Sequence, residues 1–119
     1  MTPAAVSRYF AAARALDGTA MAAVFAPEGI LRDPAAPIAV EGLAALGAFY
    51  RGLLSAFESL DIREAEVVVS GRFAAARFVG KGKAQDGRTL SFEGLDVFEF
   101  DAQGRVLSLQ GFWDPSVLA

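Results

Sequence analysis

The spacing of apolar residues changes once along the chain, near Leu60, and this change limits the possible folds more than any other feature. Before it, apolar residues recur at helical intervals. After it, β-branched and aromatic runs are interrupted by Ser70-Gly71, Asp86-Gly87 and residues 101–104, all of which suit hairpin connections. Helices gathered in one half and strands in the other predict an α+β fold, because alternating βαβ units would mix the two patterns.

Three helices are predicted in the first half. Thr2 and Pro3 form a natural cap and first turn, and the later helices show apolar residues along one face. Pro34 favours an extended residue before it. The predicted order is a first helix ending at Asp17-Gly18, a second over 19–25, an extended segment over 29–33, a turn over 34–37 and a third helix over 43–57.

Four antiparallel strands are predicted in the second half, over 60–70, 73–84, 88–100 and 105–113. A curved antiparallel sheet wrapped around the three N-terminal helices would form a cone with an apolar interior, where small ligands commonly bind. The chain has 119 residues and no linker or internal repeat. Residues 1–119 are therefore expected to form one domain.

The absence of two residue types restricts the chemistry. The chain has no cysteine and no histidine, which excludes thiolate nucleophiles, zinc–thiolate sites, disulfides and histidine acid–base catalysis. Catalysis would have to use carboxylates, phenols or cationic side chains, and no cofactor or metal is expected. The net charge of -3 comes with no basic stripe, so nucleic acid is not an expected partner.

The apolar content predicts a pocket, a subunit interface or both. Apolar residues make up 54% of the chain, above the usual fraction of about 45 to 50%. The first ten residues do not resemble a signal peptide, and no apolar run reaches the roughly 18 residues of a membrane span. A cytoplasmic protein without a membrane partner is expected.

Asp96 is in phase with the apolar face of the predicted strand 88–100. Alternation places it with Leu90, Phe92, Gly94, Phe98 and Phe100, and the opposite face is more polar. Burial among phenylalanines would raise the pKa of this carboxyl, so that its neutral form could donate a hydrogen bond. The alternative is a structural salt bridge, for which the candidate partners are Arg72, Arg77 and Arg88.

Asp33, Tyr9, Tyr50 and Trp113 are further candidates. Asp33 precedes a turn that supplies no cation, so its carboxylate can stay unpaired at a pocket mouth, although an aspartate that only starts a turn is commoner. The two tyrosines lie on apolar helix faces, where each hydroxyl needs a buried partner and where a core role is the usual one. Trp113 suits a pocket wall or a packing anchor equally well.

Short motifs spread over nearly the whole chain together resemble one known family. They are Ser7-Arg8-Tyr9, Leu31-Arg32-Asp33-Pro34, Phe49-Tyr50-Arg51, the segment 95–101, Gly104-Arg105-Val106 and Gly111-Phe112-Trp113. This set resembles the bacterial ketosteroid isomerases (steroid Δ5-3-ketoisomerases) of the NTF2-like and SnoaL-like superfamily. No single motif is specific, and the joint presence of Tyr9, Asp33 and Asp96 is what narrows the resemblance.

The resemblance implies a function and a role for each candidate. The implied enzyme is a cofactor-free isomerase that moves the double bond of a 3-ketosteroid from the 5,6 to the 4,5 position, and it is a homodimer formed through the sheet. Asp33 would be the general base, and Tyr9 and a protonated Asp96 would hold the enolate oxygen. The supporting residues would be Tyr50 behind Tyr9, Trp113 as an aromatic wall, Phe25 in place of a third tyrosine, and the neighbouring Phe49 and Phe98.

Two other functions remain open at this point. A SnoaL-like polyketide cyclase, or another small-molecule isomerase, would use the same cone and an aspartate base on a different carbonyl substrate. A non-catalytic NTF2-like module would use the cone for ligand binding or the sheet for assembly. The second alternative gives no reason for a carboxylate in an apolar interior, and the pKa of Asp96 would discriminate between the two classes.

Overall fold

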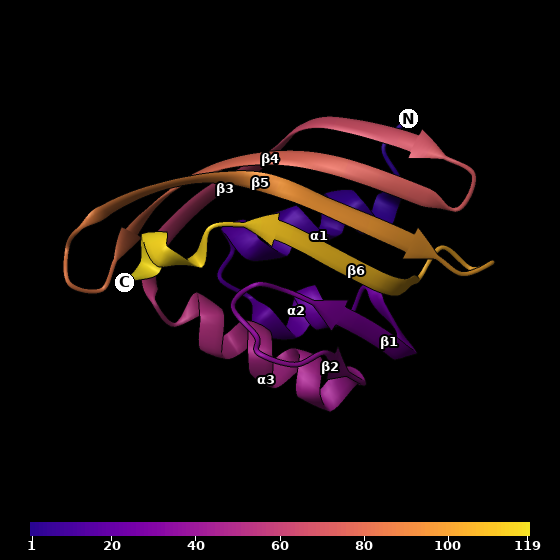
Figure 1. Cartoon of the computed structure of the whole chain (residues 1–119), viewed down its shortest axis with the longest axis horizontal. Helices are drawn as coiled ribbons and strands as arrows, with labels where there is room; N and C mark the ends of the chain where they lie inside the picture. The colour runs from indigo at the N-terminus through magenta and orange to yellow at the C-terminus, as the bar shows by residue number, and fades with distance from the viewer.

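The helices precede most of the strands and lie against one face of a curved sheet (Figure 1). The computed structural model describes residues 1–119. Its helices are α1 (Ala4–Arg14), α2 (Gly18–Ala22) and α3 (Leu43–Leu54). Its strands are β1 (Phe25–Arg32), β2 (Val40–Glu41), β3 (Phe57–Ser70), β4 (Phe73–Ala84), β5 (Thr89–Phe100) and β6 (Val106–Trp113), and a short 3-10 helix, η1 (Pro115–Leu118), follows.

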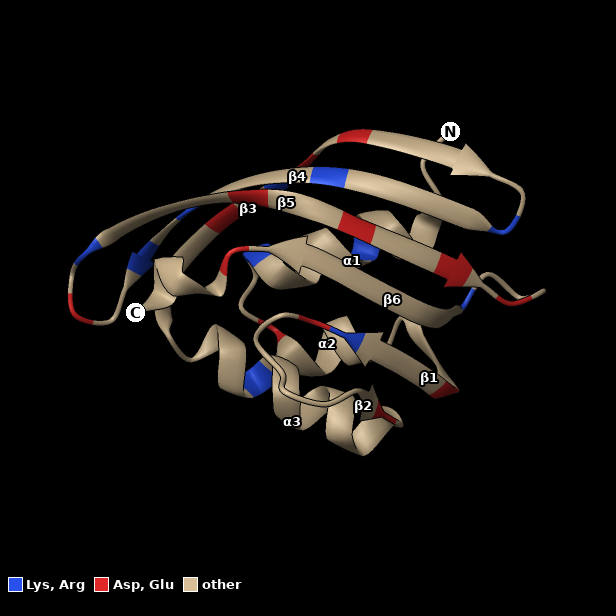
Figure 2. Cartoon of the chain, viewed as in Figure 1, with Lys and Arg blue, Asp and Glu red and all other residues tan.

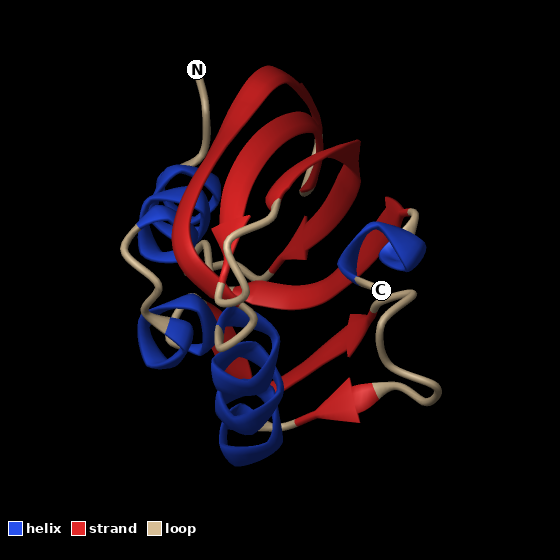
Figure 3. Ribbon diagram, turned by 90° about the vertical axis from the view of Figure 1, so that its left-hand side faces the viewer, coloured by secondary structure: helices blue, strands red, loops and turns tan.

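The sheet has the strand order β2-β1-β6-β5-β4-β3. All neighbours are antiparallel except β1 and β6, which are parallel. The two edge strands, β2 and β3, do not pair, and the strands curl around the space beside the helices without closing into a barrel (Figure 3). The predicted α+β class and the curved sheet over three helices are confirmed.

The first two helices and the long strands lie close to their predicted positions, whereas the segment around Phe25 differs. The predicted second helix, 19–25, ends at Ala22, and Phe25 begins β1 instead. Val24 is β-branched and Pro27 lacks a backbone N–H, so both disfavour a continuing helix. Phe25 is 3% exposed and pairs with Val106 of β6.

The third helix is also shorter than predicted, and one small strand was not predicted. Phe57 was expected to end α3 but begins β3, where it pairs with Ala84 of β4. Its ring lies against Gly82, where a Cβ would come within 2.7 Å of the ring. The two-residue strand β2 adds an antiparallel edge to β1. Its brevity leaves no periodic signal in the sequence.

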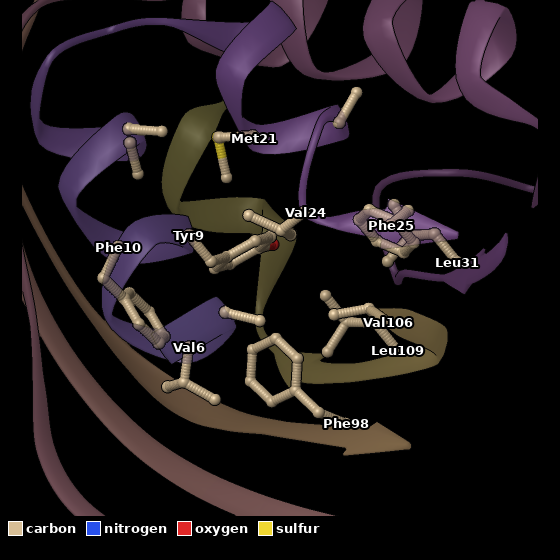
Figure 4. Close-up of a cluster of buried hydrophobic side chains, with 14 of the residues drawn as sticks. Val6, Tyr9, Phe10, Met21, Val24, Phe25, Leu31, Phe98, Val106 and Leu109 are labelled. Atoms are coloured by element: carbon tan, nitrogen blue, oxygen red, sulfur yellow. The ribbon is translucent and has the colours of Figure 1, made fainter. Parts of the chain in front are cut away.

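The core fills the space between the helices and the concave face of the sheet. Val6 and Phe10 of α1 meet Phe98 of β5 there, and all three side chains are fully buried (Figure 4). Gly18 lets α2 approach α3 closely, because a Cβ at this position would lie 2.5 Å from the backbone nitrogen of Arg51. The helices therefore pack tightly beneath the sheet.

The convex face of the sheet carries several apolar side chains exposed to solvent. Leu95 and Phe112 are direct cross-strand neighbours and are 45% and 50% exposed. Charged residues of both signs are scattered over the strands and connections, without a separate basic face in this view (Figure 2). No helix combines the length and the apolar character that crossing a membrane requires.

Candidate active site

Apart from the two tyrosines, Asp96 is the only residue with a polar side chain that is buried, at 6% exposed. The burial pattern of β5 alternates as predicted and turns Asp96 toward the concave side. The three arginines considered as partners pair elsewhere: Arg72 with Glu99, Arg77 with Glu66 and Arg88 with Asp86. Asp96 has no ion pair and no hydrogen bond within the protein, and its side chain lines an apolar cavity.

The surroundings of Asp96 favour its neutral form. Burial raises the pKa of this carboxyl well above its ordinary value, and the negative charge of Asp33 raises it further. A protonated carboxyl has one O–H to donate. Asp96 can therefore act as a hydrogen-bond donor to a group inside the cavity.

Tyr9 and Tyr50 form a buried pair of phenols. Tyr9 comes from α1 and Tyr50 from α3, and their hydroxyl oxygens are 3.0 Å apart. Burial is the main reason that the pKa of each phenol lies well above its usual value. Only Tyr9 also lines the cavity, and its side chain reaches across the interior between Met21 and Phe98 (Figure 4). Either hydroxyl can donate in this bond, and with Tyr50 as the donor the Tyr9 proton is free for a ligand.

Asp33 lies at the end of β1 and is bound by the indole of Trp113 at the end of β6. The Trp113 Nε1–H donates to both carboxyl oxygens of Asp33, at 3.2 and 3.1 Å. The backbone N–H of Ala35 also donates to this carboxyl, at 2.9 Å. Asp33 therefore starts a turn, as the common role of an Asp-Pro pair predicts, and faces the site as well. The parallel pairing of β1 with β6, which the sequence did not predict, brings it there.

Gly111 is a residue that sequence reasoning did not identify as part of the site. It pairs directly with Asp96 across β5 and β6. A Cβ at Gly111 would lie 2.9 Å from Asp33 Oδ2 and 3.3 Å from Asp96 Oδ1, so both carboxyl groups converge over this glycine. The available signal was a glycine inside a strand, which often marks a close approach of other groups.

The cavity beside Asp96 has a volume of about 70 Å³. Tyr9, Asp96 and Trp113 line it together, and the rest of its wall is apolar. Asp33 lies outside this cavity, in an open groove formed with the loop that follows it, and Trp113 lines both spaces. No cationic side chain lines the cavity, which therefore suits a neutral ligand better than an anion.

The remaining predicted residues support the tyrosines and do not line the cavity. The Phe98 ring packs edge-on against Tyr9, with ring centres 5.4 Å apart. Phe49 and Phe25 pack against Tyr50, at 5.5 and 6.2 Å. Phe25 provides no hydroxyl, so the hydrogen-bonded chain behind Tyr9 consists of Tyr50 alone.

The arrangement combines one carboxylate with two neutral donors in a largely apolar setting. A carboxylate such as Asp33 can accept a proton from carbon when a neighbouring carbonyl oxygen is stabilised. Tyr9 and neutral Asp96 are donors of the kind that stabilise a developing oxyanion in a site with little water. The geometry therefore suits proton transfer next to a carbonyl group.

Comparisons with known proteins show the family to which the chain belongs. The SnoaL-like domain model matches residues 6–109. A protein from Nocardioides simplex named Steroid Delta-isomerase is 36% identical over 112 residues, which are 94% of this chain and 89% of the relative.

Solved structures support the fold. A hypothetical protein with a ketosteroid isomerase-like fold from Catenulispora acidiphila DSM 44928, in complex with trimethylamine, superposes with a TM-score of 0.88 at 16% identity, covering 99% of this chain and 91% of that chain. SalBIII, an epoxide hydrolase/cyclase-like enzyme of pyran ring formation in the polyether salinomycin, gives 0.80 at 20% identity, covering 94% and 89%. At these identities the two structures bear on the fold alone, and they confirm the predicted cone.

Proposed function

Because this chain belongs to the SnoaL-like family, we propose that it is a steroid Δ-isomerase, which moves a carbon–carbon double bond of a 3-ketosteroid from the 5,6 to the 4,5 position. The observation that carries the proposal is the partnerless, buried Asp96 beside Tyr9, with Asp33 converging on it over Gly111. The name of the relative from Nocardioides simplex, Steroid Delta-isomerase, supports this choice of substrate.

The proposed reaction is a proton transfer within one molecule. The Asp33 carboxylate removes the proton from the carbon that lies between the carbonyl and the double bond. The electron pair of that C–H bond forms the dienolate, whose negative charge rests on the oxygen. Asp33 then returns the same proton to the far end of the dienolate, so that no other reactant is consumed.

Tyr9 and Asp96 hold the dienolate oxygen in this proposal. Two neutral donors form stronger hydrogen bonds to the oxygen as its negative charge develops than they form to the neutral ketone. They therefore stabilise the transition state more than the bound substrate. The proposal assigns Tyr50 as the donor in its 3.0 Å hydrogen bond with Tyr9, which leaves the Tyr9 proton for the dienolate oxygen. The Trp113 indole holds Asp33 through its N–H.

The family resemblance also implies a homodimer, and the convex face of the sheet is its proposed interface. Leu95 and Phe112 form the centre of this face and are half exposed in the single chain. Half-exposed apolar neighbours of this kind are typical of surfaces that are covered in an assembly.

The first test is to mix the protein with a 5-ene-3-ketosteroid and follow the ultraviolet absorbance of the conjugated 4-ene-3-ketone. Conversion well above the buffer rate is expected, and Asp33→Asn should abolish most of it while a phenolic steroid still binds. Near-wild-type turnover in Asp33→Asn would remove Asp33 from the role of base. No conversion, despite tight binding of the phenol, would point to another carbonyl substrate, as in a cyclase, or to a binding role.

A further inference from the structure

The far end of the cavity is closed by a second, small apolar cluster. It consists of Phe57, Ala84 and Leu90, with Phe92 and Leu118 packed against it. Phe92 lies four residues before Asp96 on β5, and a strand advances about 3.3 Å per residue, so roughly 13 Å of strand separate the two. A ligand whose oxygen sits at Asp96 therefore extends toward Phe92 and Leu118 as it becomes longer.

Two glycines of β4 fix the aromatic part of this wall. The Phe92 ring lies directly on Gly80, in space that a Cβ would occupy, and the Phe57 ring lies on Gly82 in the same way. The two rings pack against each other with centres 6.1 Å apart. Because both rings rest on the sheet itself, this side of the wall is firmly held.

Leu118 closes the other side and is held less firmly. It belongs to η1, a single turn with no buried residue. Asp114 caps the turn through the N–H of Ser116 at 3.0 Å, and the Arg88 guanidinium donates to the carbonyl oxygen of Ala119 at 2.6 Å. Both contacts are exposed to solvent, so displacing the turn breaks hydrogen bonds that water can replace.

The cavity is too small for a large ligand unless part of its wall moves, so it matters which side of the wall is held less firmly. The volume of about 70 Å³ is several times smaller than the roughly 300 Å³ at the lower end for sites of drug-sized ligands. A ligand with one ring needs little additional space, whereas a four-ring ligand requires part of the wall to move. The one wall element without a buried residue is η1.

We propose that Leu118 and Phe92 are specificity-determining residues, which set how many fused rings a ligand held at Tyr9 and Asp96 can have, and that a four-ring ligand is admitted when η1 carries Leu118 out of the cavity. The proposal rests on the proposed function in that Tyr9 and Asp96 bind the ligand oxygen. It adds a limit on ligand length and a moving element to that site.

The test uses phenols, whose oxygen resembles the dienolate oxygen and whose binding does not require turnover. Phenol itself and a phenolic four-ring steroid are titrated by calorimetry into wild type and Leu118→Trp. The larger side chain should weaken the four-ring ligand by about tenfold or more and leave phenol within about twofold. Val117→Trp is the matched control, because Val117 lies on the same turn but does not line the cavity, and it should leave the affinity ratio unchanged.

A second variant enlarges the cavity from the firmly held side. Phe92→Ala should raise the ratio of four-ring to one-ring affinity by about threefold or more. Unchanged ratios in both Leu118→Trp and Phe92→Ala overturn the proposal, as does an equal weakening of both ligands by Leu118→Trp. Failure of the wild type to bind either phenol overturns both this proposal and the proposed function. Size-selective binding without isomerisation would overturn the proposed function alone.

Discussion

A buried carboxyl with no partner makes the stability of this protein depend on pH. The pKa of Asp96 is raised in the folded state, and in the unfolded chain it returns to about 3.9. Between these two values the folded protein holds a proton that the unfolded chain has released. The contribution of Asp96 to stability is therefore fully present below about pH 4 and is lost as the pH rises toward its folded pKa.

Replacing Asp96 by an uncharged isostere should remove this dependence. We expect the free energy of unfolding of Asp96→Asn to increase relative to that of the wild type as the pH is raised from 4 toward 8, because the amide does not ionise. Urea titrations at a series of pH values measure the difference. Parallel pH curves for the two proteins would contradict a raised pKa.

The two proposed oxyanion donors, Tyr9 and Asp96, should contribute similarly to turnover. Tyr9→Phe and Asp96→Ala are each expected to lower kcat by about 10²- to 10³-fold, the usual loss for one such donor. The double variant should lose more than either single variant. A double variant no slower than the slower single one would contradict a shared oxyanion site.

Replacing Tyr50 should lower kcat less than replacing Tyr9, because Tyr50 acts only through its hydrogen bond with Tyr9. Tyr50→Phe leaves the Tyr9 hydroxyl in the cavity and removes only its hydrogen-bond partner. A loss in kcat of about tenfold or less is expected, consistent with one hydrogen bond of about 1 kcal/mol. A loss as large as that of Tyr9→Phe would mean that Tyr50 itself contacts the reacting oxygen.

Much of the site could be predicted from the sequence, because alternation is a local signal. Asp96 was identified from the spacing of its neighbours, and its burial agrees with that prediction. The convergence of Asp33 and Asp96 over Gly111 could not be predicted, because it depends on the register between strands far apart in the chain. The resemblance linked these residues without indicating how they meet.

At the level of elements, the hairpin strands were predictable and the parallel pair was not. The connections at Ser70-Gly71 and Asp86-Gly87 mark their strands locally. The pairing of β1 with β6 joins residues 25–32 to residues 106–110, and nothing near either segment specifies it. The end of α2 at Ala22 has a similar origin, because the pairing of Phe25 with Val106 competes with local helix formation.

Two glycines in the helices should respond to alanine in opposite directions. Gly18→Ala should destabilise the protein, because a clash with the α3 backbone of about 1 to 3 kcal/mol outweighs the gain in helix propensity. Gly52→Ala should stabilise it by up to about 1 kcal/mol, because nothing lies near the added methyl group. Urea denaturation measures both, and equal shifts would contradict the close packing of α2 on α3.

For the whole molecule, the proposed dimer gives a direct prediction. Leu95→Glu should convert the dimer to a monomer, because it places a charge at the centre of the apolar convex face. Leu43→Glu is the control, since Leu43 is 43% exposed and lies on α3, in the helix layer. Analytical ultracentrifugation measures both states. A dimer that survives Leu95→Glu would place the interface elsewhere.

The position of β6 between β1 and β5 also affects how the protein folds. β6 is the last strand of the chain and the middle piece of the site, since it carries Gly111 and Trp113 and joins the strand before Asp33 to the strand of Asp96. Before β6 is in place, β1 and β5 have no partner between them, and their facing edges are open to other chains. Because the pairing of β6 with β1 joins residues far apart in the chain, it should form late and complete the sheet and the site in one step.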